Sequence, residues 1–185
     1  MGSLPDALSA SAVVLDASAV INLLGSGKAE KCLKGLAIPC LIEERTFAEI
    51  KRHPIPGLCH VAALDELERN ALLSVHRMTR DEYEIYLSLV SGTATKSLDD
   101  GESAAIAIAV MRGCAVVLDD RKARRVHRDR FPSVQMSSSL RLFIAAGERA
   151  GWPKERIAEY VEAARRTARM NIVKGEEGLL AAIGL

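Results

Sequence analysis

The chain has 185 residues, of which 49% are hydrophobic and only 4% aromatic, and its formal net charge is +1. This length suits one domain with a core of ordinary size, and the composition favours helices packed on a parallel sheet over a β-sandwich. The near-zero charge neither requires nor excludes a nucleic-acid partner, because the distribution of charge matters more than its sum. No apolar run reaches the roughly 18 residues of a membrane span and no signal-peptide pattern opens the chain, so we expect a soluble, cytoplasmic protein without a membrane partner.

Apolar runs and helical patterns alternate along the first half of the chain. After a loose leader, a Val-rich run ends at Asp16, and two glycines at positions 25 and 27 stop the helix that follows. We expect strands at 12–15, 38–42 and 72–75. We expect helices at 18–24, 29–36, 43–52 and 61–70.

The second half repeats this alternation and then becomes helical. Thr79 and Glu82 form a capping box that opens a helix, and a nearly uncharged helix ends at Gly113. The run at 114–118 is the clearest strand of the chain, and a basic helix follows Asp120. We expect an edge strand at 134–136 and three final helices at 137–147, 154–170 and 176–183.

Strands alternating with helices predict βαβ units and a parallel sheet. We therefore expect an α/β fold with three layers (α/β/α), a central parallel sheet of four to five strands, and extra C-terminal helices. The predicted core spans residues 1–136, and residues 137–185 form a helical extension of the same domain. The four cysteines show no Cys-x-x-Cys spacing, which favours reduced thiols in a cytosolic protein.

Acidic residues gather beside the apolar runs. They are Asp16, Glu49, the group Asp99, Asp100 and Glu102, and the pair Asp119 and Asp120. In open parallel sheets the functional crevice lies at the carboxyl ends of the strands, where two of these clusters are expected. Two like charges about 4 Å apart repel by about 4 kcal/mol at an effective dielectric of about 20, so adjacent carboxylates raise their pKa values or bind a cation. No His or Cys set accompanies them, which favours Mg²⁺ or Mn²⁺ over zinc.

Each acid also has a structural interpretation. Asp16 fits a helix N-cap, Glu49 fits a solvated helix face, and acids at a helix start favour the helix dipole. A run of cations follows the last cluster and includes Arg121, Lys122, Arg124 and Arg125. These residues fit either a solvated helix face or a surface that grips phosphates.

The order of these motifs resembles the PIN domain, the nuclease fold of VapC-type toxins and of several RNA-processing enzymes. The resemblance spans roughly residues 12–136 and is closer to an uncharacterised prokaryotic PIN-like subgroup than to typical toxins. It rests on VVLDASAVIN at 13–22, TFAEI at 46–50, SLDDGE at 97–102 and VVLDD at 116–120. It implies that Asp16, Glu49 and Glu102 occupy the first three acidic positions and that Asp119 or Asp120 occupies the fourth. Two positions depart from the family pattern: Glu102, where many members have Asp, and Leu118, where many have Thr or Ser.

The resemblance implies a Mg²⁺- or Mn²⁺-dependent endoribonuclease that hydrolyses RNA, one setting being the toxin of a toxin–antitoxin pair. It also implies a homodimer and, for toxins, an antitoxin partner that plugs the acidic pocket. The expected catalytic residues are Asp16, Glu49, Glu102 and Asp119. The expected metal-binding residues are Asp16, Asp99, Glu102, Asp119 and Asp120. The expected substrate-binding residues are Ser18, Asn22, Arg121, Lys122, Arg124 and Arg125.

Two rivals remain open at this stage. A catalytically degenerate PIN-like scaffold would bind RNA or a protein partner without cutting. A phosphatase of the haloacid dehalogenase type is the less favoured rival, because it needs Asp-x-Asp after the first strand and the chain has Asp16-Ala17-Ser18 there.

Overall fold

The computed structural model describes residues 8–52, 60–91 and 97–185. Five strands form one sheet in the order β3-β2-β1-β4-β5, and every neighbouring pair is parallel. The strands are β1 (Val13–Leu15), β2 (Cys40–Glu43), β3 (Ser74–His76), β4 (Ala115–Val117) and β5 (Met136–Ser137). The predicted parallel sheet is therefore confirmed, with β1 at its centre.

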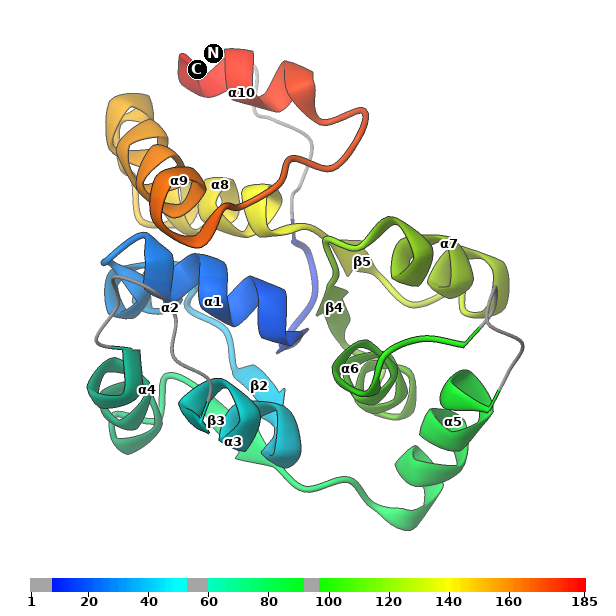
Figure 1. Cartoon of the computed structure of the whole chain (residues 1–185). Coiled ribbons are helices and arrows are strands. Elements are labelled where there is room, and N and C mark those ends of the chain that lie inside the picture. Colours follow the sequence, from blue (N-terminus) through cyan, green and yellow to red (C-terminus); the bar gives the residue numbers. More distant parts are fainter. Residues whose placement is uncertain (1–7, 53–59, 92–96) are drawn as a thin grey trace.

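Helices cover both faces of this sheet (Figure 1). One face packs against α1 (Ala17–Gly25), α2 (Ala29–Leu36), α3 (Glu44–Arg52), α4 (His60–Arg69), α8 (Ser139–Arg149) and α9 (Lys154–Ala168). The other face packs against α5 (Arg80–Val90), α6 (Asp100–Arg112) and α7 (Arg121–Arg130). The short α10 (Glu177–Ile183) follows α9 and buries Ile183 in the core on the same face of the sheet as α1 and α9. The three-layer α/β/α fold with extra C-terminal helices is thus as predicted.

Alternation along β1 divides the core between the two faces. Val13 and Leu15 belong to the cluster under α1 and α8, whereas Val14 belongs to the cluster under α6. This follows from the strand geometry, in which successive side chains point to opposite faces. All three side chains are almost fully buried. A strand buried on both faces reads as a continuous apolar run, which is why the sequence revealed it so clearly.

The helix boundaries follow local hydrogen-bonding chemistry. Thr79 and Glu82 make both bonds of the capping box at the start of α5. Gly113 ends α6 with φ of +62°, a left-handed conformation that glycine adopts without a side-chain penalty. Almost every residue in the middle of α6 is buried, as expected for a helix enclosed between the sheet and α5.

The third strand begins later than predicted. Residues 72 and 73 were expected in a strand, but the backbone N–H groups of Leu72 and Leu73 donate to the carbonyl of Leu67 instead. Ala71 has a φ of +54°, which turns the chain back on the end of α4. These two residues therefore close α4, and β3 begins at Ser74.

Two further findings bear on the predictions from composition. Among the described residues, no helix combines the length and apolar character needed to cross a membrane. Cys32, Cys40 and Cys114 are free and buried, and Cys59 lies outside the described residues. Burial raises the pKa of the Cys32 and Cys40 thiols to about 12, so both stay protonated at neutral pH.

Candidate active site

Three central strands deliver carboxylates to one edge of the sheet. Asp16 follows β1 directly, Glu43 is the last residue of β2, and Asp119 comes two residues after β4. Because β1 pairs in parallel with both β2 and β4, these strand ends lie side by side. This is the edge at which open α/β sheets place their functional crevice.

Asp16 is buried, with 3% of its surface exposed, and both of its carboxylate oxygens lie within hydrogen-bond distance of a donor. The Ser18 hydroxyl lies 2.9 and 3.0 Å from its two oxygens, and the Ala19 N–H donates to Oδ1 at 2.8 Å. Burial is the main cause that raises the pKa of Asp16 to about 7, and the negative charges of Asp119 and Glu102 add to it. Asp16 is therefore both the N-cap of α1 and a member of a group of mutually repelling acids.

Asp119 is held by donors from two distant parts of the chain. The Asn22 amide donates to its Oδ2 at 3.0 Å, and Ser139 donates its backbone N–H to Oδ1 at 2.8 Å and its hydroxyl to Oδ2 at 2.5 Å. Burial raises the pKa of Asp119, and the two hydrogen bonds from Ser139, followed by the charge of Arg124, partly oppose this rise. Asn22 also donates to the Ser139 hydroxyl at 3.0 Å. The contacts of Asn22 therefore orient Asp119. That Asn22 binds substrate stays a prediction.

Asp120 and Glu102 are a second pair of neighbouring acids at this edge. Asp120 caps α7 by accepting from the N–H groups of Lys122 and Ala123 at 2.7 and 2.9 Å. Burial raises the pKa of Glu102 to about 7, with further contributions from the charges of Asp120 and Asp99. Asp119 is thus an electrostatic neighbour of Asp16, and Asp120 of Glu102. Asp119 and Asp120 are therefore each close enough to another acid of the site to raise its pKa.

Glu49 lines a cavity of about 370 Å³ between α3 and the start of α6. Glu43, Thr46, Asp100 and Gly101 line the same cavity. The Tyr86 hydroxyl donates to Asp100 at 2.9 Å, so Asp100 has a partner. Asp99 is the N-cap residue of α6, but its exposed side chain makes no capping hydrogen bond. The carboxylate of Asp99 is therefore not used to cap the helix.

Two residues of this edge were missed by the sequence reasoning. Glu43 is buried and accepts from the Thr46 N–H at 2.9 Å. Its signal was present, because Glu43 closes an apolar run just as Asp16 does. Ser139 had no signal, because serines at a helix start are ordinary and only the fold brings this last member of the run Ser137–Ser139 to Asp119.

The predicted substrate-binding cations differ in their surroundings. Arg124 donates from Nη1 to the carbonyls of Leu118 and Ser137, both at 2.8 Å, and so ties together the ends of β4 and β5. Arg121 and Arg125 are exposed, and the charge of Lys122 lowers the pKa of Glu102. Ser18 is committed to Asp16. The assignment of these residues to substrate binding stays a prediction.

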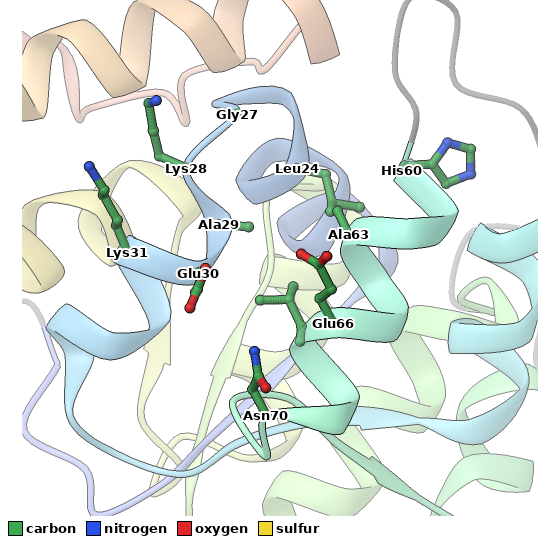
Figure 2. Close-up of a pocket in the computed structure, with 11 residues that line it drawn as sticks. Leu24, Gly27, Lys28, Ala29, Glu30, Lys31, His60, Ala63, Glu66 and Asn70 are labelled. Atoms are coloured by element: carbon green, nitrogen blue, oxygen red, sulfur yellow. The ribbon is translucent and has the colours of Figure 1, made fainter.

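A cavity of about 360 Å³ lies between α2 and α4, away from this set of residues (Figure 2). Lys28, Lys31, His60, Glu66 and Asn70 are among its lining residues, and none of the predicted site residues reaches it. The His60 ring nitrogen Nε2 is 2.8 Å from the Ile50 carbonyl, which gives that side chain a structural role.

The carboxylates at this edge of the sheet are suitable ligands for a divalent cation. Within residues 8–52, 60–91 and 97–185, no three Asp, Glu, His or Cys side chains are already grouped as a metal site. However, Mg²⁺ commonly binds through one or two carboxylates and keeps several waters, so a ready three-residue group is not required. Asp16, Glu102 and Asp119 supply hard oxygen donors whose repulsion a cation would relieve. Mn²⁺ accepts the same oxygen ligands.

The chain matches no curated protein. The family model described as "DUF3368: PIN domain" matches residues 12–142. PIN domains are typically nucleases and generally use divalent metals. The match covers well over half of the chain, and the five-stranded sheet in the order 3-2-1-4-5 agrees with it. The protein therefore belongs to the PIN-domain family.

Proposed function

We propose that the protein is a Mg²⁺- or Mn²⁺-dependent endoribonuclease that hydrolyses phosphodiester bonds of single-stranded RNA. One observation carries this proposal: Asp16, Glu102 and Asp119 converge at the carboxyl edge of the sheet, where burial raises the pKa of all three and the charges of Asp119 and Glu102 raise that of Asp16 further. Such a group is stable at neutral pH when a cation neutralises it. Membership of a family of typical nucleases supports the same conclusion.

Asp16 and Asp119 are the proposed metal ligands, with Glu102 beside them. A divalent metal bound there would lower the pKa of a water molecule and neutralise charge that builds up on the phosphate. Ser18 holds Asp16, and Asn22 and Ser139 hold Asp119, so both carboxylates are oriented before substrate arrives. Glu49 and Asp99 are proposed to orient ligands or water from the edge of the site.

The test is cleavage of end-labelled single-stranded RNA by purified protein with Mn²⁺. Asp119→Asn keeps the size of the side chain but removes its charge, and we expect it to lose more than about 100-fold of the rate. Asp129→Asn is the matched control, because Asp129 is an exposed aspartate of α7 outside the acidic group. Equal cleavage by wild type and Asp119→Asn would indicate a contaminating nuclease and would refute the proposal. No cleavage by the wild type with any divalent metal would also refute it.

A toxin role is the biological setting that we propose for this activity, with a homodimer and an antitoxin partner. Induced expression in a bacterial host tests it without knowledge of the partner. Growth arrest by wild type but not by Asp119→Asn is the expected result. Equal growth with both proteins, at equal expression, would argue against a toxin.

A non-cutting scaffold that binds RNA or a protein partner is the second candidate. The observation in its favour is that no three metal-ligand side chains are grouped among the described residues. The cleavage assay separates the two candidates, because the scaffold predicts RNA binding without Mn²⁺-dependent cutting.

A further inference from the structure

The segment after α9 returns to the acidic edge. α9 lies directly against α1: a Cβ added to Gly25 would meet the Cβ of Ala168 at 2.5 Å, so only glycine permits this approach. Met170 is 5% exposed and Glu176 is 4% exposed, so both ends of the segment 170–176 are buried. In Figure 1 this orange-to-red chain leaves α9 and runs past α8 before it enters α10.

Glu176 binds this segment to the start of α8, which also holds Asp119. The Ser138 hydroxyl donates to its Oε2 at 2.6 Å, and Arg141 Nε donates to its Oε1 at 2.7 Å. Arg124 Nη2 lies 3.9 Å from the same Oε1. Ser138 directly precedes Ser139, the residue that donates twice to Asp119. Two adjacent residues, Ser138 and Ser139, therefore contact the C-terminal segment and the acidic site respectively.

Between this segment and α7 lies a cavity of about 450 Å³. Asp119, Arg121, Arg124 and Arg128 line one wall. Ile172, Val173 and Lys174 line the other. Its volume falls within the range of about 300–1,000 Å³ that is typical of ligand sites. Since residues 172–174 follow the family match at 12–142, this wall is a feature of this chain beyond the matched domain.

The lining is rich in unpaired positive charge. Arg121, Arg128 and Lys174 are exposed, and among the described residues none of them forms an ion pair with an acid. Arg124 is different, because Glu176 and two carbonyls already engage it. Arg121, Arg128 and Lys174 therefore line a cavity that Asp119 also lines. Such an arrangement attracts an anion that lies next to the metal-binding edge.

We propose that this cavity binds a phosphodiester of single-stranded RNA adjacent to the one that is cut, with Arg128, Arg121 and Lys174 as its cationic contacts. The proposal rests on the proposed ribonuclease function and names where the rest of the RNA chain lies. Cations give affinity for the backbone without sequence preference. Ile172 and Val173, which are half-buried, supply apolar surface beside the cations. The C-terminal extension thereby forms one wall of the substrate site.

Binding of a labelled single-stranded RNA in EDTA tests this inference without any cutting. Fluorescence anisotropy at several salt concentrations gives the slope of log affinity against log salt, which loses about 0.7 for each phosphate contact removed from a single strand. Arg128→Gln with Lys174→Gln should make the slope shallower by about 1.4, and Lys174→Gln alone by about half of that. The matched control is Arg156→Gln with Lys154→Gln, two exposed cations in the first turn of α9. The helix has 15 residues, so they lie roughly 20 Å from its other end.

A slope that falls in the cavity variant and not in the control supports the inference. An unchanged slope in the cavity variant, an equal fall in the control, or no RNA binding by the wild type would overturn it. Failure of the ribonuclease proposal is seen separately, as absence of cleavage with Mn²⁺. All four substituted side chains are exposed, and circular dichroism of each variant checks that the fold is intact.

Discussion

In the absence of a divalent metal, Asp16→Asn should destabilise the protein at low pH and stabilise it at high pH. The pKa of Asp16 is about 7 in the folded protein, compared with the ordinary aspartate value of 3.8 that we take for the unfolded chain. Between these two values the folded state keeps a proton that the unfolded state has lost. The free energy of unfolding of the wild type therefore falls as pH rises from about 4 to about 7, and the variant lacks this loss.

The size of the effect follows from the pKa shift. The rise of this pKa from 3.8 to about 7 corresponds to about 4 kcal/mol, because each tenfold change in the ionisation equilibrium is worth about 1.36 kcal/mol. Asparagine keeps the Oδ1 acceptor, which lies 2.8 Å from the Ala19 nitrogen and 2.9 Å from the Ser18 hydroxyl. Its NH₂ group replaces the Oδ2 acceptor, which lies 3.0 Å from the same hydroxyl, and this change costs about 1 kcal/mol. We therefore expect Asp16→Asn to be less stable than wild type by about 1 kcal/mol at pH 4 and more stable by about 3 kcal/mol at pH 8.

Urea unfolding in EDTA at pH 4, 6 and 8 measures this difference. Asp129→Asn makes the same chemical change at an exposed position and should track the wild type at all three values. A difference between Asp16→Asn and wild type that stays constant with pH would refute the reasoning. So would a variant that is less stable than wild type at pH 8.

Three further predictions concern the same group of residues. Millimolar Mn²⁺ at pH 8 should raise the melting temperature of the wild type but not of Asp16→Asn, because a ligand stabilises only the state that binds it; equal shifts would contradict this. Ser139→Ala should lower the free energy of unfolding by about 1–2 kcal/mol in urea, because Asp119 loses a buried hydroxyl donor, and an unchanged value would mean that the bond contributes nothing. Glu176→Gln should lower the free energy of unfolding by about 1–3 kcal/mol, because its charge-assisted hydrogen bonds are lost. Glu159→Gln, at an exposed position of α9, should lower it by less than about 0.5 kcal/mol. Similar losses in both variants would refute this role for Glu176.

The parts of the site that lie next to strands could be predicted from the sequence. Asp16 and Asp119 each follow a buried Val-rich run, and parallel pairing of β1 with β4 brings the two run ends together. The same rule would have found Glu43 at the end of β2, had the apolar run before it been weighed equally. The family resemblance, rather than periodicity, directed attention to Glu49.

The donors that hold the acids could not be predicted in this way. Ser139 is 20 residues from Asp119, and Glu176 is 38 residues from Ser138. Neither pair follows from a local pattern, because both depend on how the C-terminal helices pack on the sheet. Arg124 shows the same limit: its place in a basic run suggested a surface residue, whereas the ends of β4 and β5 engage it.

The central claim is that the acids at the carboxyl edge form one divalent-cation site. Calorimetric titration of Mn²⁺ into wild type, Asp119→Asn and Asp129→Asn at pH 8 tests it most directly. We expect the wild type and Asp129→Asn to bind Mn²⁺ at millimolar concentration or below, and Asp119→Asn to bind at least about tenfold more weakly. No binding by the wild type at millimolar Mn²⁺, or equal binding by Asp119→Asn, would contradict the claim.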